Sequence, residues 1–351
     1  MTVGVNISHD ASICIKKEDS VEFFEESRFN KNKGWEPTAE DFDYKSFSKI
    51  KDFNDLFIFT SFGRHTYWND ETHIKLAKSL SLKPPFSKDE LIIKNICKKY
   101  NIKNYFFNGN EHHIYHAVAG FYLAPFNEAT CVVVNGGGTC PPSTISQMFP
   151  FPEIYREVDS IYHIDIKKIN PLYKKYSNGR YTALNTNLKN KLKLKNILKS
   201  FKNKNYESDL NSAEFEFNNC KYNVSSFYNP GLLYHHLCET IGTFTMYHYG
   251  SYTAPGKAMG LSSYGKSEGL RDEDLAKQVQ EVTEEYTIDL IERALMFSDC
   301  RNIVLSGGYF LNCVNNYKYT QYFKNVNFFV DPCPHDGGTA FGAALWYDNY
   351  K

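Results

Sequence analysis

The sequence predicts an α/β fold, and two observations lead to that prediction. In several places a short apolar run, typical of a buried strand, ends in a glycine turn that a helical pattern follows. Such runs begin at residues 129, 302 and 327. The 351 residues also exceed the usual size of one domain, roughly 100–200 residues, so we expect two globular units or one large two-lobed unit.

The predicted strands form two groups along the chain. The first group opens with a hairpin, because the turn-prone segment Lys-Glu-Asp-Ser at residues 17–20 separates two short apolar runs. The second group begins with a continuous apolar run that ends at Asn135. In chain order we expect strands at residues 3–7, 12–16, 21–25, 56–60, 129–134, 143–149, 161–168, 302–305 and 327–330.

The predicted helices show apolar residues at helical spacing. The longest covers residues 272–297, where Val282, Tyr286 and Leu290 belong to one apolar stripe. Another ends before Pro125, which cannot continue a helix. We expect helices at residues 88–100, 111–122, 232–247, 272–297 and 339–347, and one more after residue 308.

Composition restricts the class of protein. Hydrophobic residues make up 42% and aromatic residues 16% of the chain, enough to build a core. Forty Lys and Arg balance forty Asp and Glu, so no global field directs the chain to nucleic acid or membrane. Nine cysteines form no C-x-x-C pair, and no apolar run reaches the ~20 residues of a spanning helix. We therefore expect a cytoplasmic protein with no membrane partner.

One segment, residues 166–206, is rich in Lys, Arg and Asn and has no Asp or Glu. Two interpretations are open. The favoured one is a helical insertion whose charged face meets solvent. The other is a contact with nucleic acid or a nucleotide, in which aromatic side chains among the cations stack on bases. The candidate stacking residues are Tyr173, Tyr176, Tyr181 and Phe201.

His112 and His116 are the sharpest local feature. They lie four residues apart in a predicted helix, so both project from one face, and His113 points elsewhere. Neutral imidazoles bind zinc or iron, and a histidine pair needs a carboxylate to complete an open site. The alternative is a pair of surface histidines, because this spacing is common without a metal.

His9 and Asp10 follow the first predicted strand. A histidine beside an aspartate can act as a general base near neutral pH, with the aspartate fixing its tautomer. The alternative is a pair of solvated hairpin residues. The glycine turns at residues 135–138, 306–308 and 337–338 suit phosphate binding, although none has the Rossmann or P-loop spacing.

Several motifs in one order give a more specific indication than any single one. They are GVNISHDAS at 4–12, EESRFNKNK at 25–33, EHHIYHA at 111–117, FYLAPF at 121–126, VVVNGGG at 132–138, GLLY at 231–234, GKAMGLSSYG at 256–265, LSGGYFLN at 305–312 and DGGTAFGAAL at 336–345. In these motifs the chain resembles the O-carbamoyltransferases of nodulation-factor and antibiotic biosynthesis.

The resemblance implies an actin-like ATPase fold of two ribonuclease-H-like lobes, which we place at residues 1–127 and 128–351. It implies transfer of a carbamoyl group from carbamoyl-adenylate, made from carbamoyl phosphate and ATP, to a hydroxyl of a small molecule, sugar or nucleotide. The implied ligands of a divalent metal, iron before zinc or manganese, are His112, His116 and Asp336, and His9 is the implied base. The positions implied to contact phosphate or nucleotide are Arg28, Lys33, Asn135, Gly136, Gly137, Lys257, Gly260, Gly307, Gly308 and Asn312.

Two departures from the family pattern bear on these expectations. Asn135 stands where the family usually has an aspartate, so one negative charge is missing near the implied metal. The sequence also stops shortly after Leu345, where full-length relatives continue into a YrdC-like domain that makes carbamoyl-adenylate. We therefore expect a separate YrdC-like protein or another donor. The alternatives are a threonylcarbamoyl-transferring relative that acts on tRNA and a non-catalytic, nucleotide-binding regulatory subunit.

Overall fold

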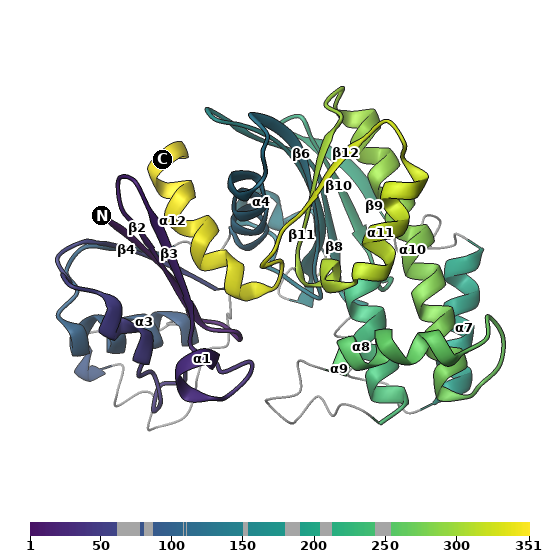
Figure 1. Ribbon diagram of the computed structural model, residues 1–351, viewed down its shortest axis with the longest axis horizontal. Helices are drawn as coiled ribbons and strands as arrows, with labels where there is room; N and C mark the ends of the chain where they lie inside the picture. The colour runs from purple at the N-terminus through teal and green to yellow at the C-terminus, as the bar shows by residue number, and fades with distance from the viewer. Residues whose placement is uncertain are drawn as a thin grey trace.

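The computed structural model describes residues 1–61, 78–80, 87–107, 109, 111–149, 154–179, 190–203, 213–242 and 254–351. These residues form two β-sheets with helices packed on them (Figure 1). The predicted α/β class is confirmed. The first sheet uses residues before 108, and the second uses residues after 127.

The first sheet has the strand order β3-β2-β1-β4-β5. The predicted hairpin strands are present, and the predicted strand at residues 56–60 lies parallel to the first of them. The short fifth strand was not predicted. The bounds are β1 (Thr2–Asn6), β2 (Ser12–Lys16), β3 (Val21–Glu25), β4 (Leu56–Thr60) and β5 (Tyr105–Phe107), with α1 (Ser27–Asn30) and η1 (Lys45–Lys49) between β3 and β4.

Helix α3 (Lys88–Tyr100) covers the first sheet at the predicted residues. It begins at a capping box, in which Ser87 accepts a hydrogen bond from the N–H of Glu90 and the Glu90 carboxylate accepts one from the N–H of Ser87. Ile92, Ile93 and Ile96 face the core of the first sheet. This explains why the helical spacing of the apolar residues was a reliable signal.

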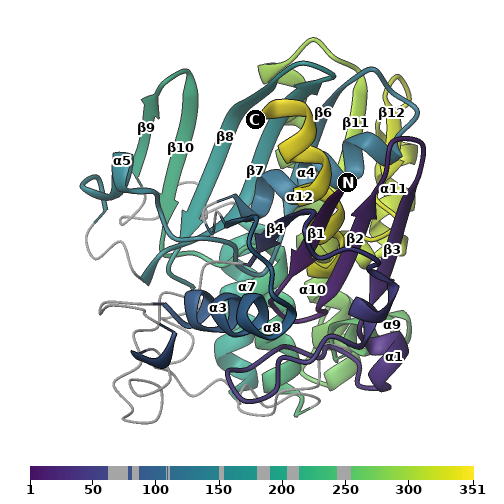
Figure 2. The same ribbon diagram turned by 90° about the vertical axis from the view of Figure 1, so that its left-hand side faces the viewer.

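The second sheet has the strand order β12-β11-β6-β7-β8-β10-β9, and Figure 2 shows these strands in that order across the sheet. The bounds are β6 (Glu128–Val134), β7 (Arg156–Asp165), β8 (Ile169–Ser177), β9 (Ala213–Phe217), β10 (Cys220–Ser225), β11 (Asn302–Ser306) and β12 (Asn327–Val330). β6 is buried on both faces, because Val132 and Val134 belong to one core and Cys131 and Val133 to another. Its continuous apolar run is therefore typical of a central strand.

One predicted strand of the second sheet is wrong. Residues 143–149 contain the helical turn α5 (Ser143–Ser146). Pro142 leads into this turn, and the four-residue spacing of Ile145 and Phe149 buries both in the same cluster. Residues four apart share a face in a strand as well as in a helix, so this spacing could not distinguish the two.

Helices cover the outer side of the second sheet, away from the first (Figure 1). Their bounds are α7 (Lys191–Lys202), α8 (Pro230–Thr240), α9 (Ala254–Leu261), η3 (Ser262–Tyr264), α10 (Asp272–Phe297), η4 (Gly308–Leu311) and α11 (Cys313–Tyr322). α10 has the predicted bounds. The predicted helix at 232–247 corresponds to α8, and its last five residues lie outside the described residues.

The segment at residues 166–206 is not one insertion. Residues 169–177 form β8, which pairs with β7 on one side and β10 on the other. Tyr173, Tyr176 and Phe201 are buried in hydrophobic clusters, so these rings cannot stack on bases without unfolding. Tyr181 lies outside the described residues. Among the described residues of the segment, α7 alone fits the predicted solvated helix, with Leu194 and Leu198 buried along one edge.

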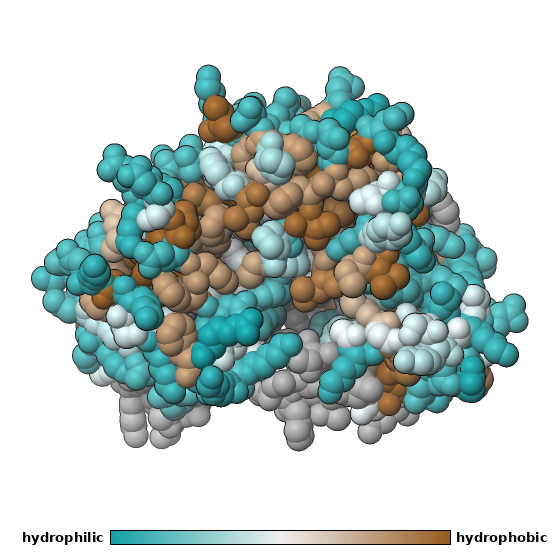
Figure 3. Space-filling model, in the orientation of Figure 1, coloured by the Kyte–Doolittle hydropathy of each residue, from teal (hydrophilic) through white to brown (hydrophobic). Residues whose placement is uncertain are grey.

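Two helices join the sheets. α4 (His112–Leu123) packs on the second sheet, and α12 (Thr339–Tyr350) packs on β1, β2 and β4 of the first and against α4. Figure 3 shows hydrophobic side chains across the middle of the molecule, where these helices lie, between hydrophilic edges. α12 belongs to the second half of the chain but covers the sheet of the first half. The two sheets therefore do not fix where one lobe ends, and the lobe boundary at residue 127 stays a prediction.

Gly342 lets α12 approach α4 closely. A Cβ atom there would lie 1.8 Å from the backbone oxygen of Tyr115, so we expect Gly342→Ala to lower the free energy of unfolding by about 1–3 kcal/mol. The measurement is urea denaturation. Gly260→Ala is the matched control, because nothing lies within 4 Å of its added Cβ, and we expect it to be neutral or slightly stabilising. Equal stability of Gly342→Ala and the wild type would contradict this packing.

In the part of the chain that the structure describes, no helix combines the length and apolar character needed to cross a bilayer.

Candidate functional site

The first two turns of α4 carry the predicted histidine pair. His112 and His116 are both fully buried, and their Nε2 atoms lie 3.3 Å apart. His113 points away from them, as predicted, with its Nδ1 atom 2.9 Å from Oγ of Ser160. The helical spacing therefore brings two imidazole nitrogens to one point inside the protein rather than to its surface.

Asp336 completes a three-residue cluster with this pair. It opens the short helix η5 (Asp336–Gly338), directly before α12, and its Oδ1 lies 3.4 Å from Nε2 of both His112 and His116. One atom from each residue lies within 4.8 Å of the others, a spacing suited to one cation. The structure thus brings the three predicted ligands together from distant parts of the chain.

Asn135 stands at the end of β6 and faces the same point. Its Nδ2 lies 3.0 Å from Nε2 of His112, 3.3 Å from Nε2 of His116 and 3.2 Å from Oδ1 of Asp336, while its Oδ1 accepts the N–H of Gly136. Two imidazoles and a carboxylate are a donor set that divalent transition metals favour. The three ligands fit a cation, which would displace the Asn135 amide or turn its oxygen inward.

The ionisation states also suit a cation. Burial lowers the pKa of His116 to about 4, so its ring is neutral near pH 7. Burial alone would raise the pKa of Asp336, but the charges of His9 and His112 and hydrogen bonds from His112 and His116 outweigh this effect and hold it well below its usual range. A neutral imidazole and an ionised carboxylate are the forms that bind metals.

His9 and Asp10 lie in the turn between β1 and β2, next to this cluster. The amide of Asn6 donates to the backbone oxygens of His9 and Asp10, and Asp10 has a positive φ of 56°. His9 Nε2 lies 3.1 Å from Oδ2 of Asp336, and His9 Nδ1 lies 3.1 Å from Oδ2 of Asp10. The two carboxylates hold the ring from both sides and orient it toward the three-residue cluster.

The charge balance decides what His9 can do. Burial alone would lower its pKa, but the carboxylates of Asp336 and Asp10 raise it above the usual value of 6.5. The ring is therefore a proton donor while both carboxylates are uncompensated. The predicted role as a base requires that a cation balance the charge of Asp336.

Two of the three glycine turns, at residues 135–138 and 306–308, come together where neighbouring strands end. β6 and β11 are parallel neighbours, and a Cβ at Gly307 would lie 2.3 Å from the backbone oxygen of Val134. The N-terminus of α8 also meets this point, because a Cβ at Gly231 would lie 2.8 Å from the backbone nitrogen of Gly136. Gly136, Gly137 and Gly308 are partly exposed here. Backbone N–H groups of such turns and a helix N-terminus suit a phosphate.

Asn229 also lies near the glycine turns, although it was not predicted from the sequence to belong to the site. It is the N-cap of α8, and its amide donates 2.7 Å to the backbone oxygen of Asn135 and 2.9 Å to Oδ1 of Asp159. Asparagine before proline at a helix start was the available signal. Glu25, Cys333 and His335 were also not assigned a role from the sequence, although the last two come shortly before Asp336.

Other predicted contacts remain predictions. Arg28, Lys33, Lys257 and Gly260 lie on the surface, and Arg28 is 3.6 Å from Oε2 of Glu25. The side chain of Asn312 is buried, caps α11 and bonds to Gln280. This arrangement favours a structural role for the Asn312 side chain over the predicted nucleotide contact.

Together these features define the class of protein: a two-sheet α/β protein of actin-like fold, with a His-His-Asp cluster where α4 meets the start of α12. The carbamoyltransferase N-terminus family matches residues 64–345, and the chain belongs to this family. The family predicted from the motifs is thus confirmed. His9, Asp10, Arg28 and Lys33 precede the matched residues.

Individual relatives are distant. The uncharacterized protein sll1178 of Synechocystis sp. is 25% identical over an alignment of 261 residues that covers 71% of this chain and 37% of that protein. T. kodakarensis HypF has a TM-score of 0.57 at 13% identity, covering 99% of this chain and 47% of HypF. HypF in its phosphate- and nucleotide-bound form has a TM-score of 0.54 at 13% identity, with 99% and 55% covered. These likenesses confirm the fold class. The chain spans about half the length of these relatives or less.

Proposed function

We propose that the chain transfers a carbamoyl group from carbamoyl-adenylate to a hydroxyl of a small molecule, sugar or nucleotide. One observation carries the proposal: the two oxygens of Asp336 face different partners. Oδ1 faces His112 and His116, and Oδ2 faces His9. A cation ligand set and a proton-transferring group therefore share one carboxylate, and this arrangement suits an acyl-type transfer to a hydroxyl, in which a metal can polarise the donor while a base takes the hydroxyl proton.

Each residue of this site has a role in the proposal. His112, His116 and Asp336 would hold a divalent metal, iron before zinc or manganese, which when bound would polarise the donor carbonyl and balance phosphate charge. His9 would take the proton of the acceptor hydroxyl at Nε2 as the hydroxyl oxygen bonds to the carbamoyl carbon and AMP leaves with the electrons of the broken bond. Asp10 would keep the ring in the required tautomer, because it accepts the hydrogen bond of Nδ1.

The glycine turns are proposed to hold the adenylate. Gly136, Gly137, Gly307 and Gly308 offer backbone N–H groups near the ligand cluster, and HypF, which shares the fold, has been solved with phosphate and nucleotide bound. Carbamoyl phosphate and ATP would be the source of the adenylate, formed by a YrdC-like protein. The basic Arg28 and Lys33 would approach its phosphate.

The test supplies carbamoyl-adenylate, made in place by a YrdC-like protein from labelled carbamoyl phosphate and ATP, with a panel of sugars and nucleosides. We expect a labelled acceptor heavier by one carbamoyl group, and about a 10²-fold slower reaction with His9→Gln. His163→Gln is the matched control, because His163 is also partly buried but pairs with Glu128 outside the site. Equal rates for wild type and His9→Gln would contradict the assigned role of His9.

Asn135 supports a second candidate function. Its amide N–H₂ group faces His112, His116 and Asp336, so it can take the place of a cation among these three side chains. A regulatory subunit that binds nucleotide without turnover fits this arrangement. Tight nucleotide binding with neither a carbamoylated product nor bound metal would favour the subunit. The tRNA-directed and nucleic-acid alternatives are less supported, because the described aromatic residues of the basic segment are buried.

A further inference from the structure

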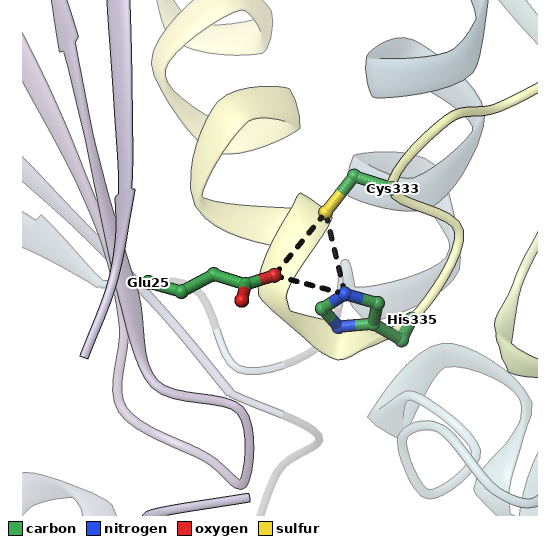
Figure 4. Close-up of side chains that lie close together, drawn as sticks. All are labelled: Glu25, Cys333 and His335. Atoms are coloured by element: carbon green, nitrogen blue, oxygen red, sulfur yellow. Dashed lines mark hydrogen bonds and ion pairs between the residues drawn. The ribbon is translucent and has the colours of Figure 1, made fainter. Parts of the chain in front are cut away.

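Figure 4 shows a second group of ligand-type side chains, Glu25, Cys333 and His335. Glu25 is the last residue of β3, whereas Cys333 and His335 belong to the segment between β12 and η5. Oε1 of Glu25 is 3.0 Å from Nε2 of His335 and 4.0 Å from Sγ of Cys333, and that sulfur is 3.5 Å from the same Nε2. Three different donor atoms thus converge on one point.

We propose that Glu25, Cys333 and His335 form a zinc site that is separate from the His112–His116–Asp336 cluster. Zinc is bound by thiolate, imidazole and carboxylate at about 2.0–2.3 Å, which in a tetrahedron separates the ligand atoms by about 3.3–3.8 Å. The observed separations of 3.0–4.0 Å surround that range. The three atoms can therefore bind one ion with small side-chain movements.

The surroundings hold two of the ligands in place. The backbone N–H of Cys333 donates to Asp331 Oδ1 at 2.8 Å, and Glu25 ends a strand that is paired along its length with β2. Oδ2 of Asp10 lies 3.8 Å from Nδ1 of His335. At present Nδ1 of His335 accepts the N–H of Gly337. An ion bound to Nε2 would place the ring proton on Nδ1, and Nδ1 would then donate to Asp10.

The site would be open to a fourth ligand. The side chains of Glu25 and His335 remain 19% and 23% exposed, in contrast to the buried first cluster. Three protein ligands and one free position are typical of exchangeable or catalytic zinc. Because His335 precedes Asp336, zinc here would also tie the segment that carries Asp336 to β3 of the first sheet.

The proposal does not depend on carbamoyl transfer, so its test uses no turnover. The full chain is freed of metal and titrated with Co²⁺, which gives a thiolate-to-cobalt charge-transfer band in the near ultraviolet only when a cysteine binds it. We expect the band in the wild type, its loss in Cys333→Ser, and at least about tenfold weaker binding in His335→Gln. A wild type without the band overturns the proposal.

Three controls make the result specific. Cys313→Ser removes an exposed cysteine elsewhere and should keep the band. His112→Gln removes a ligand of the first cluster and should keep it too, which separates the two sites. Zinc should slow alkylation of Cys333 by iodoacetamide in the folded wild type, as followed by peptide mass spectrometry. Equal alkylation with and without zinc would mean a free thiol and would overturn the proposal.

Discussion

Asp336→Asn is expected to reduce carbamoyl transfer by about 10³-fold, the largest catalytic effect we predict. Asparagine keeps the shape of the side chain but removes the charge that faces His112 and His116 through Oδ1 and His9 through Oδ2. The amide nitrogen would also place a donor where an acceptor is needed. Both cation binding and the orientation of His9 should therefore fail together.

The measurement combines transfer rate, metal content and nucleotide binding on the same preparation. Metal content should fall with the rate, whereas nucleotide binding at the glycine turns should persist. Asp348→Asn is the matched control, because Asp348 is a partly exposed aspartate that pairs with Thr2 and Lys16. An Asp336→Asn variant that keeps its metal and its rate would remove the basis of the proposed function.

Part of the site could be predicted from local pattern. The four-residue spacing of His112 and His116 was enough to place both on one face of α4, because helix geometry is local. Asp336 was not accessible in that way, since it lies on another element more than two hundred residues along the chain. Only the resemblance to a family connected it with the histidines, and the structure brings the three together.

The partners of His335 could not be predicted at all. Nothing in the local pattern around Cys333 and His335 indicates that β3 ends beside them, because that contact depends on how η5 and α12 cross to the first sheet. Asn135 shows a similar limit. Because Asn135 stands where the family usually has an aspartate, the sequence predicted one negative charge fewer near the metal ligands. Only the structure shows that the amide nitrogen faces His112, His116 and Asp336.

The basic segment shows why composition misleads. The composition of the segment led us to expect that its lysines face solvent. Lys174 and Lys175 are neighbours in β8, so their side chains point to opposite faces of the sheet. Other residues cover both faces there. Each lysine has its own buried partners. Lys174 Nζ lies 3.1 Å from Oε1 of Glu157, and Lys175 donates to the hydroxyl of Tyr286, which donates to Asp159. Composition counts charges but does not show which of them are buried.

Lys174→Met is accordingly expected to lower the free energy of unfolding by about 3–5 kcal/mol. The side chain of Glu157 is 1% exposed, and without Lys174 its carboxylate would be a buried charge without its cation. In the wild type, burial alone would raise the pKa of Glu157, but Lys174, followed by His113 and the hydrogen bond from Ser160, outweighs this and lowers it to about 2. Urea denaturation at pH 7 measures the loss.

The pH dependence identifies the cause of that loss. In the wild type the folded pKa of Glu157 lies below its ordinary value of 4.5, so its contribution is present above pH 4.5 and is lost as pH falls toward 2. In Lys174→Met burial should raise that pKa above 4.5, so the variant loses stability as pH rises. The deficit relative to wild type should therefore grow between about pH 5 and pH 7.

Two further variants separate charge burial from lost packing. Lys174→Met combined with Glu157→Leu should recover part of the stability, because no buried charge remains. Lys318→Met removes a cation from the more exposed pair with Glu284 and should cost no more than about 1 kcal/mol. A deficit for Lys174→Met that is equally small, or that does not change with pH, would show that the pair does not stabilise the second sheet through its charges.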